Sequence, residues 1–299
     1  MTYSEIWHRI ATSYDDGEAR AIARILIEEL FGLSYADIVC GATEQLSADD
    51  TLRLDTAVRR IEQGEPLQHV LGYADFCGNR FCVNGSVLIP RPETEWLVDE
   101  GAKLMDGCIA SDETQHKAPH SPKRILDIGT GSGCIAISLK LRLGDAYVEA
   151  WDISEEALRT AQDNADALKA EVVFRKRDAL RADNTAAPWD LIVSNPPYIC
   201  DSERSAMDDN VLLHEPHTAL FVPDDDPLRF YRAIARYALL TLNIGGSLLF
   251  ECNTRYAEAT GAMLSDMGFE EVTVSDDCFS LPRFVRGSSP SQPSPSGRA

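Results

Sequence analysis

From Arg124 to Arg286 the sequence alternates short apolar runs with longer stretches of helical periodicity. Parallel strands need long crossover connections, which helices supply, so this alternation favours an α/β fold with a parallel sheet. The apolar runs predict strands at 124–128, 147–151, 171–175, 191–194, 247–251, 271–275 and 283–286. Helices are expected at about 133–142, 154–169, 227–242 and 255–267.

The predicted strand 191–194 ends at Pro196 and Pro197, which cannot donate to a sheet ladder. Asn195 therefore lies at the carboxyl end of a buried strand, where open α/β sheets place their chemistry. The Asn195 side-chain oxygen and the Pro196 carbonyl can accept hydrogen bonds from one planar NH2 group, and Tyr198 offers a flat face. The segment is predicted to bind an amide or an aromatic amine. The alternative is a rigid turn in which Asn195 bonds its own backbone.

The segment from Asp127 to Gly133 joins the first predicted strand to its helix and contains three glycines. Glycines let the backbone approach a ligand closely, and the following helix presents free N–H groups. A dinucleotide fingerprint would need a glycine at position 134, where this chain has Cys134, so nicotinamide binding is disfavoured. The negative charge of Asp127 would repel a pyrophosphate. It suits a cationic ligand with an amino group and a sulfonium, such as S-adenosylmethionine.

Two further carboxylates follow predicted strands. Asp152 ends the second strand, where a carboxylate can accept both ribose hydroxyls, and Asp178 follows the third, where it can meet the adenine amine. The alternatives are a helix cap for Asp152 and a turn residue for Asp178. The order of the three acids along the chain favours the cofactor site.

The sequence before Arg124 differs in character. Residues 1 to about 70 have helical apolar stripes, and residues 73 to 84 alternate around Gly78-Asn79, a hairpin-type turn. The tail from Gly287 is rich in Ser and Pro and is expected to be disordered. The predicted division is a helical domain at 1–72, a β-hairpin and linker at 73–92, a catalytic domain at 93–286 and a tail at 287–299.

The formal net charge is −20, and such a chain repels polyanions at long range, which argues against a free duplex as the main substrate. The acidity is concentrated between Asp201 and Asp226, a stretch with eight acids and one Arg. Such a run is usually a solvated face. The alternative is a docking surface for a basic protein partner.

The eight cysteines form no C-x-x-C pair, so neither a metal site nor a disulfide framework is expected, and a cytoplasmic setting is favoured. No apolar run reaches about 18 residues, so no membrane span is predicted. Met1 to Arg9 lacks the apolar core of a secretory signal.

Five segments carry recognisable motifs: Pro-Leu-Gln-His-Val-Leu-Gly at 66–72, Leu-Ile-Pro-Arg-Pro-Glu-Thr-Glu at 88–95, Leu-Asp-Ile-Gly-Thr-Gly-Ser-Gly at 126–133, Ser-Asn-Pro-Pro-Tyr-Ile at 194–199, and Glu215-Pro216 followed by Ala219-Leu220. Together they resemble the PrmC/HemK family of protein-(glutamine-N5) methyltransferases, which modify peptide chain release factors. The Asn-Pro-Pro-Tyr motif is shared with DNA adenine methyltransferases, whereas the motif at 88–95 is more specific. The chain departs from the family at Cys252-Asn253-Thr254, where Gly and then Gln are usual.

The resemblance implies a helical N-terminal domain that engages a release factor and a Rossmann-like, class I S-adenosylmethionine-dependent methyltransferase domain with a mostly parallel, seven-stranded sheet. It implies that the methyl group goes to the side-chain amide nitrogen of the glutamine in the Gly-Gly-Gln motif of class 1 release factors. The residues implied to hold the cofactor are Asp127, Gly129, Thr130, Gly131, Ser132, Gly133, Asp152, Asp178, Ala179 and Asn195. Those implied to hold the glutamine are Asn195, Pro196, Pro197 and Tyr198, of which Asn195, Pro196 and Tyr198 are the candidate catalytic residues.

Two rival functions use the same features. A nucleic-acid adenine N6-methyltransferase would use the same acceptors on an exocyclic amine, but it is disfavoured by the acidity and by the lack of a basic segment interleaved with aromatics. A non-catalytic adaptor of the translation machinery would keep the fold, but Asp127, Asp152 and Asn195 count against it. The expected protein is a cytoplasmic monomer that needs no metal and has no direct nucleic-acid substrate.

Overall fold

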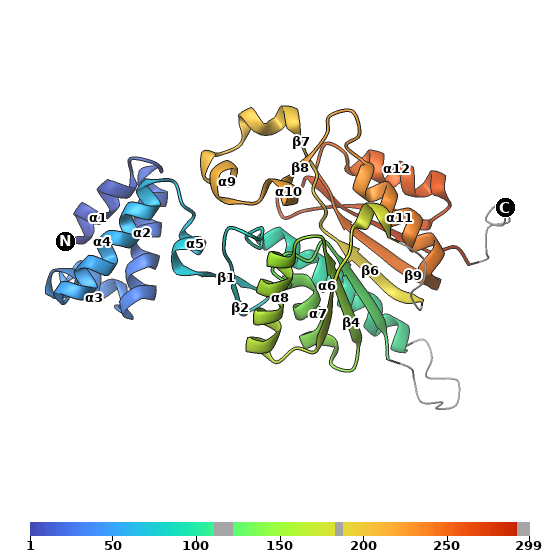
Figure 1. Ribbon diagram of the computed structural model, residues 1–299, viewed down its shortest axis with the longest axis horizontal. Helices are drawn as coiled ribbons and strands as arrows, with labels where there is room; N and C mark the ends of the chain where they lie inside the picture. Colours follow the sequence, from blue (N-terminus) through green and yellow to red (C-terminus); the bar gives the residue numbers. More distant parts are fainter. Residues whose placement is uncertain (111–121, 183–187, 292–299) are drawn as a thin grey trace.

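The computed structural model describes residues 1–110, 122–182 and 188–291. A helical unit lies at one end of the molecule and an α/β unit at the other, with a small β-hairpin between them (Figure 1). No helix in the described parts of the chain is long and apolar enough to cross a membrane.

The helical unit packs its apolar stripes into one core. Its helices are α1 (Tyr3–Ile10), α2 (Asp16–Phe31), α3 (Tyr35–Val39), η1 (Ala42–Gln45), α4 (Ala48–Glu62) and α5 (Leu67–Leu71). Ile22 and Leu26 of α2 belong to the same buried cluster as Leu54, Val58 and Ile61 of α4. The predicted apolar stripes are therefore core-forming, as amphipathic helices require.

The hairpin consists of β1 (Tyr73–Phe76) and β2 (Asn79–Cys82). Its turn is one residue earlier than expected: Phe76 pairs with Asn79, so the two turn residues are Cys77 and Gly78. Both have positive φ, 48° and 73°, as a type I′ turn requires. The expected Gly78-Asn79 turn was wrong because Gly78 serves as the second turn residue, which returns Asn79 to the strand.

The α/β unit contains a seven-stranded sheet in the order β10-β11-β9-β6-β3-β4-β5. Its strands are β3 (Arg124–Ile128), β4 (Tyr147–Asp152), β5 (Val172–Lys176), β6 (Trp189–Ser194), β9 (Leu242–Glu251), β10 (Glu270–Asp276) and β11 (Pro282–Ser288). The pairs from β9 to β5 are parallel, and β11 is antiparallel to both its neighbours. The predicted seven-stranded, mostly parallel α/β fold is confirmed.

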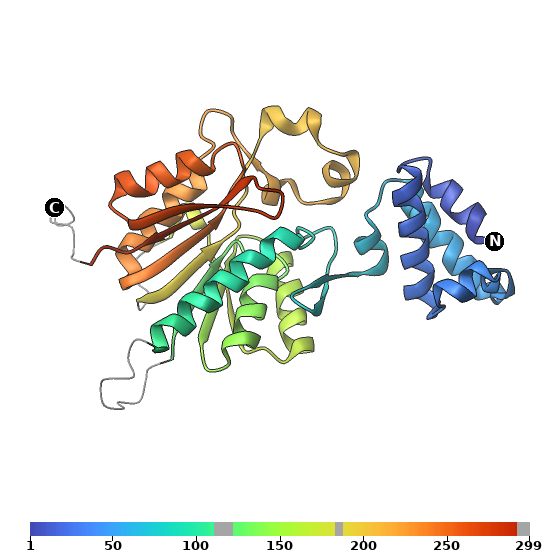
Figure 2. The same cartoon turned by 180° about the vertical axis from the view of Figure 1, so that it is seen from behind.

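Helices cover both faces of this sheet. Helices α6 (Glu95–Ala110), α7 (Cys134–Leu143) and α8 (Glu155–Leu168) share one core with Ile125, Val148, Leu191 and Leu249. Figure 2 shows α6 as the long teal helix across that face. Helices α11 (Arg229–Thr241) and α12 (Ala257–Met267) share the other core with Leu126, Ile192, Leu248 and Phe250. Successive strand residues thus face opposite cores, which explains the continuous apolar runs.

Short elements complete the unit. They are η2 (Pro92–Thr94), η3 (Ala179–Arg181), β7 (Ile199–Cys200), η4 (Asp201–Ala206), α9 (Asp209–His214), α10 (His217–Leu220) and β8 (Phe221–Val222). Strands β7 and β8 pair in parallel, a contact that the sequence did not predict.

The ordered chain also continues past the expected start of the tail. Gly287 pairs with Leu248 and Ser288 with Ser247, and the Ser289 N–H donates to the Gly246 carbonyl at 2.7 Å. The expectation of disorder from Gly287 was wrong for these residues. Their backbone groups pair with β9 on the side that faces away from β6, and this pairing orders them. Residues 292–299 lie outside the described residues.

Asn164 of α8 ties the hairpin to the α/β unit. Its Nδ2 donates to the carbonyls of Cys82 (3.0 Å) and Ser132 (2.9 Å), and its Oδ1 accepts from the Cys82 N–H at 2.6 Å. The side chain is buried. One amide thus holds both the linker and the glycine-rich loop after β3.

Replacing Asn164 by Ala should lower the free energy of unfolding by about 2–4 kcal/mol, because buried backbone groups lose their partners. Urea denaturation of the two proteins measures the difference. Gln162→Ala, an exposed position on the same helix, is the control and should change stability by less than about 0.5 kcal/mol. Equal stability for the two variants would contradict the bridging role of Asn164.

Candidate active site

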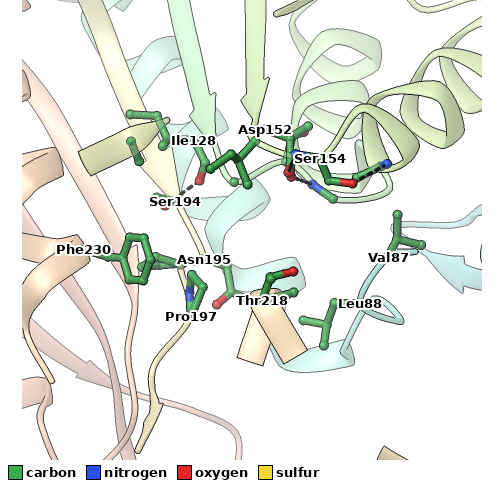
Figure 3. Close-up of a pocket in the computed structure, with 18 of the residues that line it drawn as sticks. Val87, Leu88, Ile128, Asp152, Ser154, Ser194, Asn195, Pro197, Thr218 and Phe230 are labelled. Carbon is green, nitrogen blue, oxygen red and sulfur yellow. Dashed lines mark hydrogen bonds between the residues drawn. The ribbon is translucent and has the colours of Figure 1, made fainter. Parts of the chain in front are cut away.

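A cavity of about 380 Å³ opens at the carboxyl ends of β3, β4 and β6 (Figure 3). Such edges of open α/β sheets are where ligands bind. Its inner wall is formed by residues 128–132, Asp152, Asp178, Ala179 and Asn195 to Pro197, and its outer wall includes Leu88, Arg91, Thr94, Pro216 and Thr218. The cavity therefore brings together most of the residues that the sequence singled out.

The glycine-rich loop is closely packed against its surroundings. Gly129 has φ 79°, and its N–H and that of Thr130 both donate to the Trp151 carbonyl at 2.8 and 2.9 Å. At Gly133, with φ 82°, a Cβ atom would lie 2.9 Å from Ile137 Cδ1 and 3.1 Å from the Ala161 Cβ. Only glycine fits this left-handed, crowded position, so Gly133 shapes the loop without lining the cavity.

Asp127 lies buried beneath this loop rather than in the cavity wall. Its Oδ2 accepts from the Thr130 hydroxyl at 2.6 Å, while no side chain in the described part of the chain donates to its Oδ1. Burial raises the pKa of Asp127 to about 7, partly offset by the Thr130 hydroxyl and the Ala136 backbone. A buried carboxylate without a cation beside it is costly to ionise, so positive charge on a ligand in the adjoining cavity would stabilise the ionised form of Asp127.

Asp152 lies in the cavity wall at the end of β4. Its Oδ2 accepts from the Gly131 N–H and its Oδ1 from the Ser154 N–H, both at 2.9 Å. Burial raises the pKa of Asp152 above its usual value. Ser154, not Asp152, caps α8. Each Asp152 oxygen keeps a further lone pair, so the carboxylate can still accept two hydroxyl groups of a ligand.

Asp178 combines both roles considered from the sequence. Its Oδ1 accepts from the Leu180 N–H at 2.9 Å, so it caps the turn η3. Asp178 and Ala179 also line the cavity. The cavity position of Asp178 and Ala179 and the open lone pairs of Asp152 fit the adenine and ribose of S-adenosylmethionine. The buried carboxyl of Asp127 beneath the loop fits its positive charge. Among the described residues no group of three metal-ligating side chains exists.

The Asn195 segment follows β6 directly. The Ser194 hydroxyl donates to the Ile128 carbonyl at 2.6 Å, which fixes the strand end against β3. Asn195 Nδ2 donates to Thr94 Oγ1 at 3.5 Å, so its side chain bonds a distant segment. Asn195, Pro196 and Pro197 all line the cavity.

Tyr198 lies behind this wall, outside the residues that line the cavity. Its hydroxyl donates to Glu251 Oε1 at 3.2 Å, and its ring packs against the core beneath α11. Burial raises the pKa of Tyr198, and the nearby Glu251 adds to this effect. The structure thus places Tyr198 as a support of the segment in this conformation.

An ion pair holds the outer wall together. Arg91 Nη2 donates to Glu215 Oε1 at 2.6 Å, and Glu215 Oε2 accepts from the Ile89 N–H at 3.3 Å. The Glu215 side chain is 1% exposed. Since Leu88, Pro90, Pro216 and Thr218 line the cavity, this buried carboxylate joins two segments of its wall.

Sequence reasoning missed several wall residues. Phe230, at the start of α11, projects toward Asn195 and Pro197 (Figure 3). Arg177 lines the cavity beside Asp178, with its guanidinium over the Trp151 ring at 4.7 Å. The local pattern at Phe230 indicated only a helix. For Arg177, its position directly before Asp178 in the sequence could have indicated that it lies in the cavity wall.

Comparisons with known proteins agree with this arrangement. The PrmC N-terminal domain family matches residues 8–72, and the methyltransferase small domain family matches residues 96–220. The chain is 43% identical to the release factor glutamine methyltransferase of Bacteroides thetaiotaomicron over 91% of this chain and 93% of that protein. It is 36% identical to the protein of the same name from Flavobacterium psychrophilum, over 93% and 94% of the two chains.

Among solved structures, the hMettl16 catalytic domain in complex with the MAT2A 3′UTR hairpin 6 superposes with a TM-score of 0.52 and 17% identity. The match covers 82% of this chain and 83% of that chain. This likeness concerns the fold alone.

The buried carboxyl of Asp127 predicts a pH-dependent cofactor affinity. A cationic ligand favours the ionised carboxylate, whose pKa is about 7 in the free protein, so affinity should rise as the pH rises through that value. S-adenosylmethionine should bind about tenfold more weakly at pH 6 than at pH 8. Calorimetry at both pH values measures the ratio. Asp127→Asn should bind weakly at both, without the step, and a wild-type affinity independent of pH would remove Asp127 from the cofactor site.

Proposed function

The chain belongs to the release factor glutamine methyltransferase family, and from this premise we propose that it methylates the glutamine of the Gly-Gly-Gln motif in class 1 peptide chain release factors. It is an S-adenosylmethionine-dependent methyltransferase, and the methyl group goes to the side-chain amide nitrogen (N5). The observation that carries the proposal is the Asn195-Pro196-Pro197 segment in the cavity wall, since it offers two acceptors to one primary amide.

In this proposal Asn195 and Pro196 bind the substrate. A carboxamide nitrogen is a poor nucleophile because its lone pair is delocalised into the carbonyl. The Asn195 Oδ1 and the Pro196 carbonyl accept the two amide hydrogens, hold the NH2 group in one plane and stabilise the positive charge that grows on nitrogen. The bound cofactor supplies an electrophilic methyl group. Orientation of this kind can contribute on the order of 7–11 kcal/mol.

No strong base is required of the chain. The amide nitrogen becomes acidic once it is methylated, so its proton can leave to water. Gly129 to Ser132, Asp152, Asp178 and Ala179 would hold the cofactor on the inner wall. Asp127 and Gly133 would act from behind that wall, Asp127 through its charge and Gly133 through the shape of the loop. Tyr198 supports the catalytic segment from behind through its bond to Glu251.

Protein recognition would involve the acidic segment from Asp201 to Asp226. This segment contains η4 and α9, and its residues Pro216 to Phe221 include part of the cavity wall. Asn210 of α9 interacts with the side chain of Tyr14 in the helical unit. The acidic segment and the helical unit could therefore contact one release factor, the acids steering a protein with basic patches.

The same charge supports a protein substrate over a nucleic acid. A net charge of −20 opposes binding to a polyanion, so the adenine alternative is not favoured. We place the enzyme in the cytoplasm as a monomer. The seven cysteines in the described residues are free thiols, as a reducing compartment allows.

Asn195→Ala should lower turnover about 10²–10³-fold, since one of the two acceptors for the substrate amide is lost. Cofactor affinity should change little. Steady-state methylation of purified release factor, with the product verified by mass spectrometry, measures the effect. Asn243→Ala is the matched control because Asn243 is exposed and bonds Asp190 at the opposite end of the sheet. Near-normal turnover of Asn195→Ala would show that Asn195 is not an acceptor for the substrate amide.

Intact release factor should be methylated with a higher kcat/KM than a short Gly-Gly-Gln peptide, because contacts remote from the glutamine add binding energy. The advantage should shrink as the salt concentration rises, since the acidic segment acts at long range. Rates on both substrates at low and high salt test this. Equal rates would refute docking, and methyl groups found on adenine rather than glutamine would refute the proposed function.

A further inference from the structure

Glu251 is a buried carboxylate that the proposed mechanism does not use. It is the last residue of β9 and has no exposed surface. Its Oε2 accepts from the Thr94 hydroxyl at 2.7 Å, and its Oε1 accepts from the Tyr198 hydroxyl at 3.2 Å. Both partners belong to segments that form the cavity wall or its support. Glu251 thus contacts the site from behind without reaching the cavity.

The Thr94 hydroxyl connects this carboxylate to Asn195. A hydroxyl has one hydrogen, and Thr94 donates it to Glu251. Thr94 Oγ1 can then act only as an acceptor toward Asn195, whose Nδ2 lies 3.5 Å away. The NH2 group of Asn195 is therefore turned to Thr94, and its Oδ1 is turned away from Thr94.

The opposite arrangement of hydrogen bonds would remove the side-chain acceptor from the site. If the Thr94 hydroxyl donated to Asn195, the Asn195 Oδ1 would face Thr94 and its NH2 group would be presented instead of the acceptor. An NH2 group cannot accept a hydrogen bond from a substrate amide hydrogen. The direction of one hydroxyl thus decides whether the segment presents an acceptor or a donor.

We propose that Glu251 is a positioning residue that, through Thr94, holds the Asn195 side chain with its oxygen available to the substrate amide. The inference rests on the proposed function and deepens it, since it adds Thr94 and Glu251 to the residues that determine turnover. Glu251 acts through another residue and does not touch the substrate.

The hydrogen bonds from Asn195 to Thr94 and from Thr94 to Glu251 form a relay, and the charge state of Glu251 controls its direction. An ionised carboxylate can only accept, whereas a protonated one can donate to Thr94 and free its hydroxyl to turn. Burial raises the pKa of Glu251 to about 7. The groups that face it are Thr94 and Glu93 from η2, Tyr198 after β6, Arg283 from β11 and the adjacent Cys252, and the Tyr231 hydroxyl of α11 donates to its backbone carbonyl.

Arg283 and Glu93 oppose each other: the first lowers the pKa of Glu251 and the second raises it. Arg283 is itself paired with Asp277 at 2.6 Å. Ionised Glu251 is the form that orients Thr94, so kcat at saturating cofactor should rise with pH through about 7. Saturation removes the separate effect of Asp127 on cofactor affinity.

The test compares kcat, KM for release factor and cofactor affinity in four variants. Glu251→Gln should lower kcat at pH 8 by about 10–100-fold and flatten the pH profile near 7, because its amide can donate to Thr94. Thr94→Val should lower kcat similarly, and Thr94→Ser, which keeps the hydroxyl, should restore it to within about twofold of the wild type. Cofactor affinity should stay within about twofold in all of them.

Glu149→Gln is the matched control. Glu149 is also a buried carboxylate, bonded by the Trp151 indole at 2.7 Å and the Tyr147 hydroxyl at 2.8 Å, and it does not line the cavity. Its substitution should leave kcat and the pH profile unchanged, whatever it does to thermal stability. The control distinguishes the effect on kcat of removing any buried charge from the effect of breaking the hydrogen bonds between Glu251, Thr94 and Asn195.

Wild-type kcat and pH profile in Glu251→Gln would overturn the inference, as would a Thr94→Ser variant no better than Thr94→Val. Should Glu251→Gln fail to fold, the Thr94 pair decides alone. A wild-type protein that binds S-adenosylmethionine but leaves release factor unmethylated would overturn the proposed function, and the relay with it.

Discussion

The register among the three central strands is the constraint on which the site depends. Ile128 of β3 pairs with Ser194 of β6, and Ser194 pairs with Phe250 of β9. Because the strands are parallel, their next residues emerge at one edge of the sheet, and these are Gly129, Asn195 and Glu251. A one-residue slip would turn every side chain of a strand to the other face, and both cores prevent it. The cofactor loop, the proposed amide acceptor and the carboxylate behind it thus form one row.

Two buried acids belong to this part of the sheet, at a cost in stability: Glu251 lies in the row, and Asp127 lies two residues before Gly129. Asp127 and Glu251 both have a pKa raised to about 7 by burial, and each receives a hydroxyl hydrogen bond, from Thr130 and Thr94 respectively. Apolar residues would suit these positions better for folding alone. The two acids have different roles in the functions proposed here. Asp127 provides negative charge beneath the loop that would face a cationic ligand, and Glu251 accepts hydrogen bonds at both oxygens from hydroxyls that shape the substrate side.

The outer wall depends on contacts between remote segments. The bond between Arg91 and the buried Glu215 and two of the hydrogen bonds of Asn164, those to Cys82, attach the linker to the α/β unit. The linker also carries Leu88 and Arg91, which line the cavity, and Thr94 follows two residues after its end. The segment that joins the two units of the protein is therefore part of the candidate site itself, and it connects the helical unit directly to the cavity wall.

The sequence by itself determined the seven strands of the large sheet, the helices α7, α8, α11 and α12, and most residues of the inner wall. Strand and helix periodicity, the glycines after β3 and the prolines after β6 are local features, and a missing N–H ends a strand whatever surrounds it. The tertiary structure decided the strand order, the hairpin turn at Cys77-Gly78, the extension of β11 to Ser288, and the wall residues Phe230 and Thr94. It also decided that Thr94 meets Glu251, a residue 157 positions away along the chain. Local patterns carry no information about such a contact, because it exists only once the sheet has brought η2 and the end of β9 together.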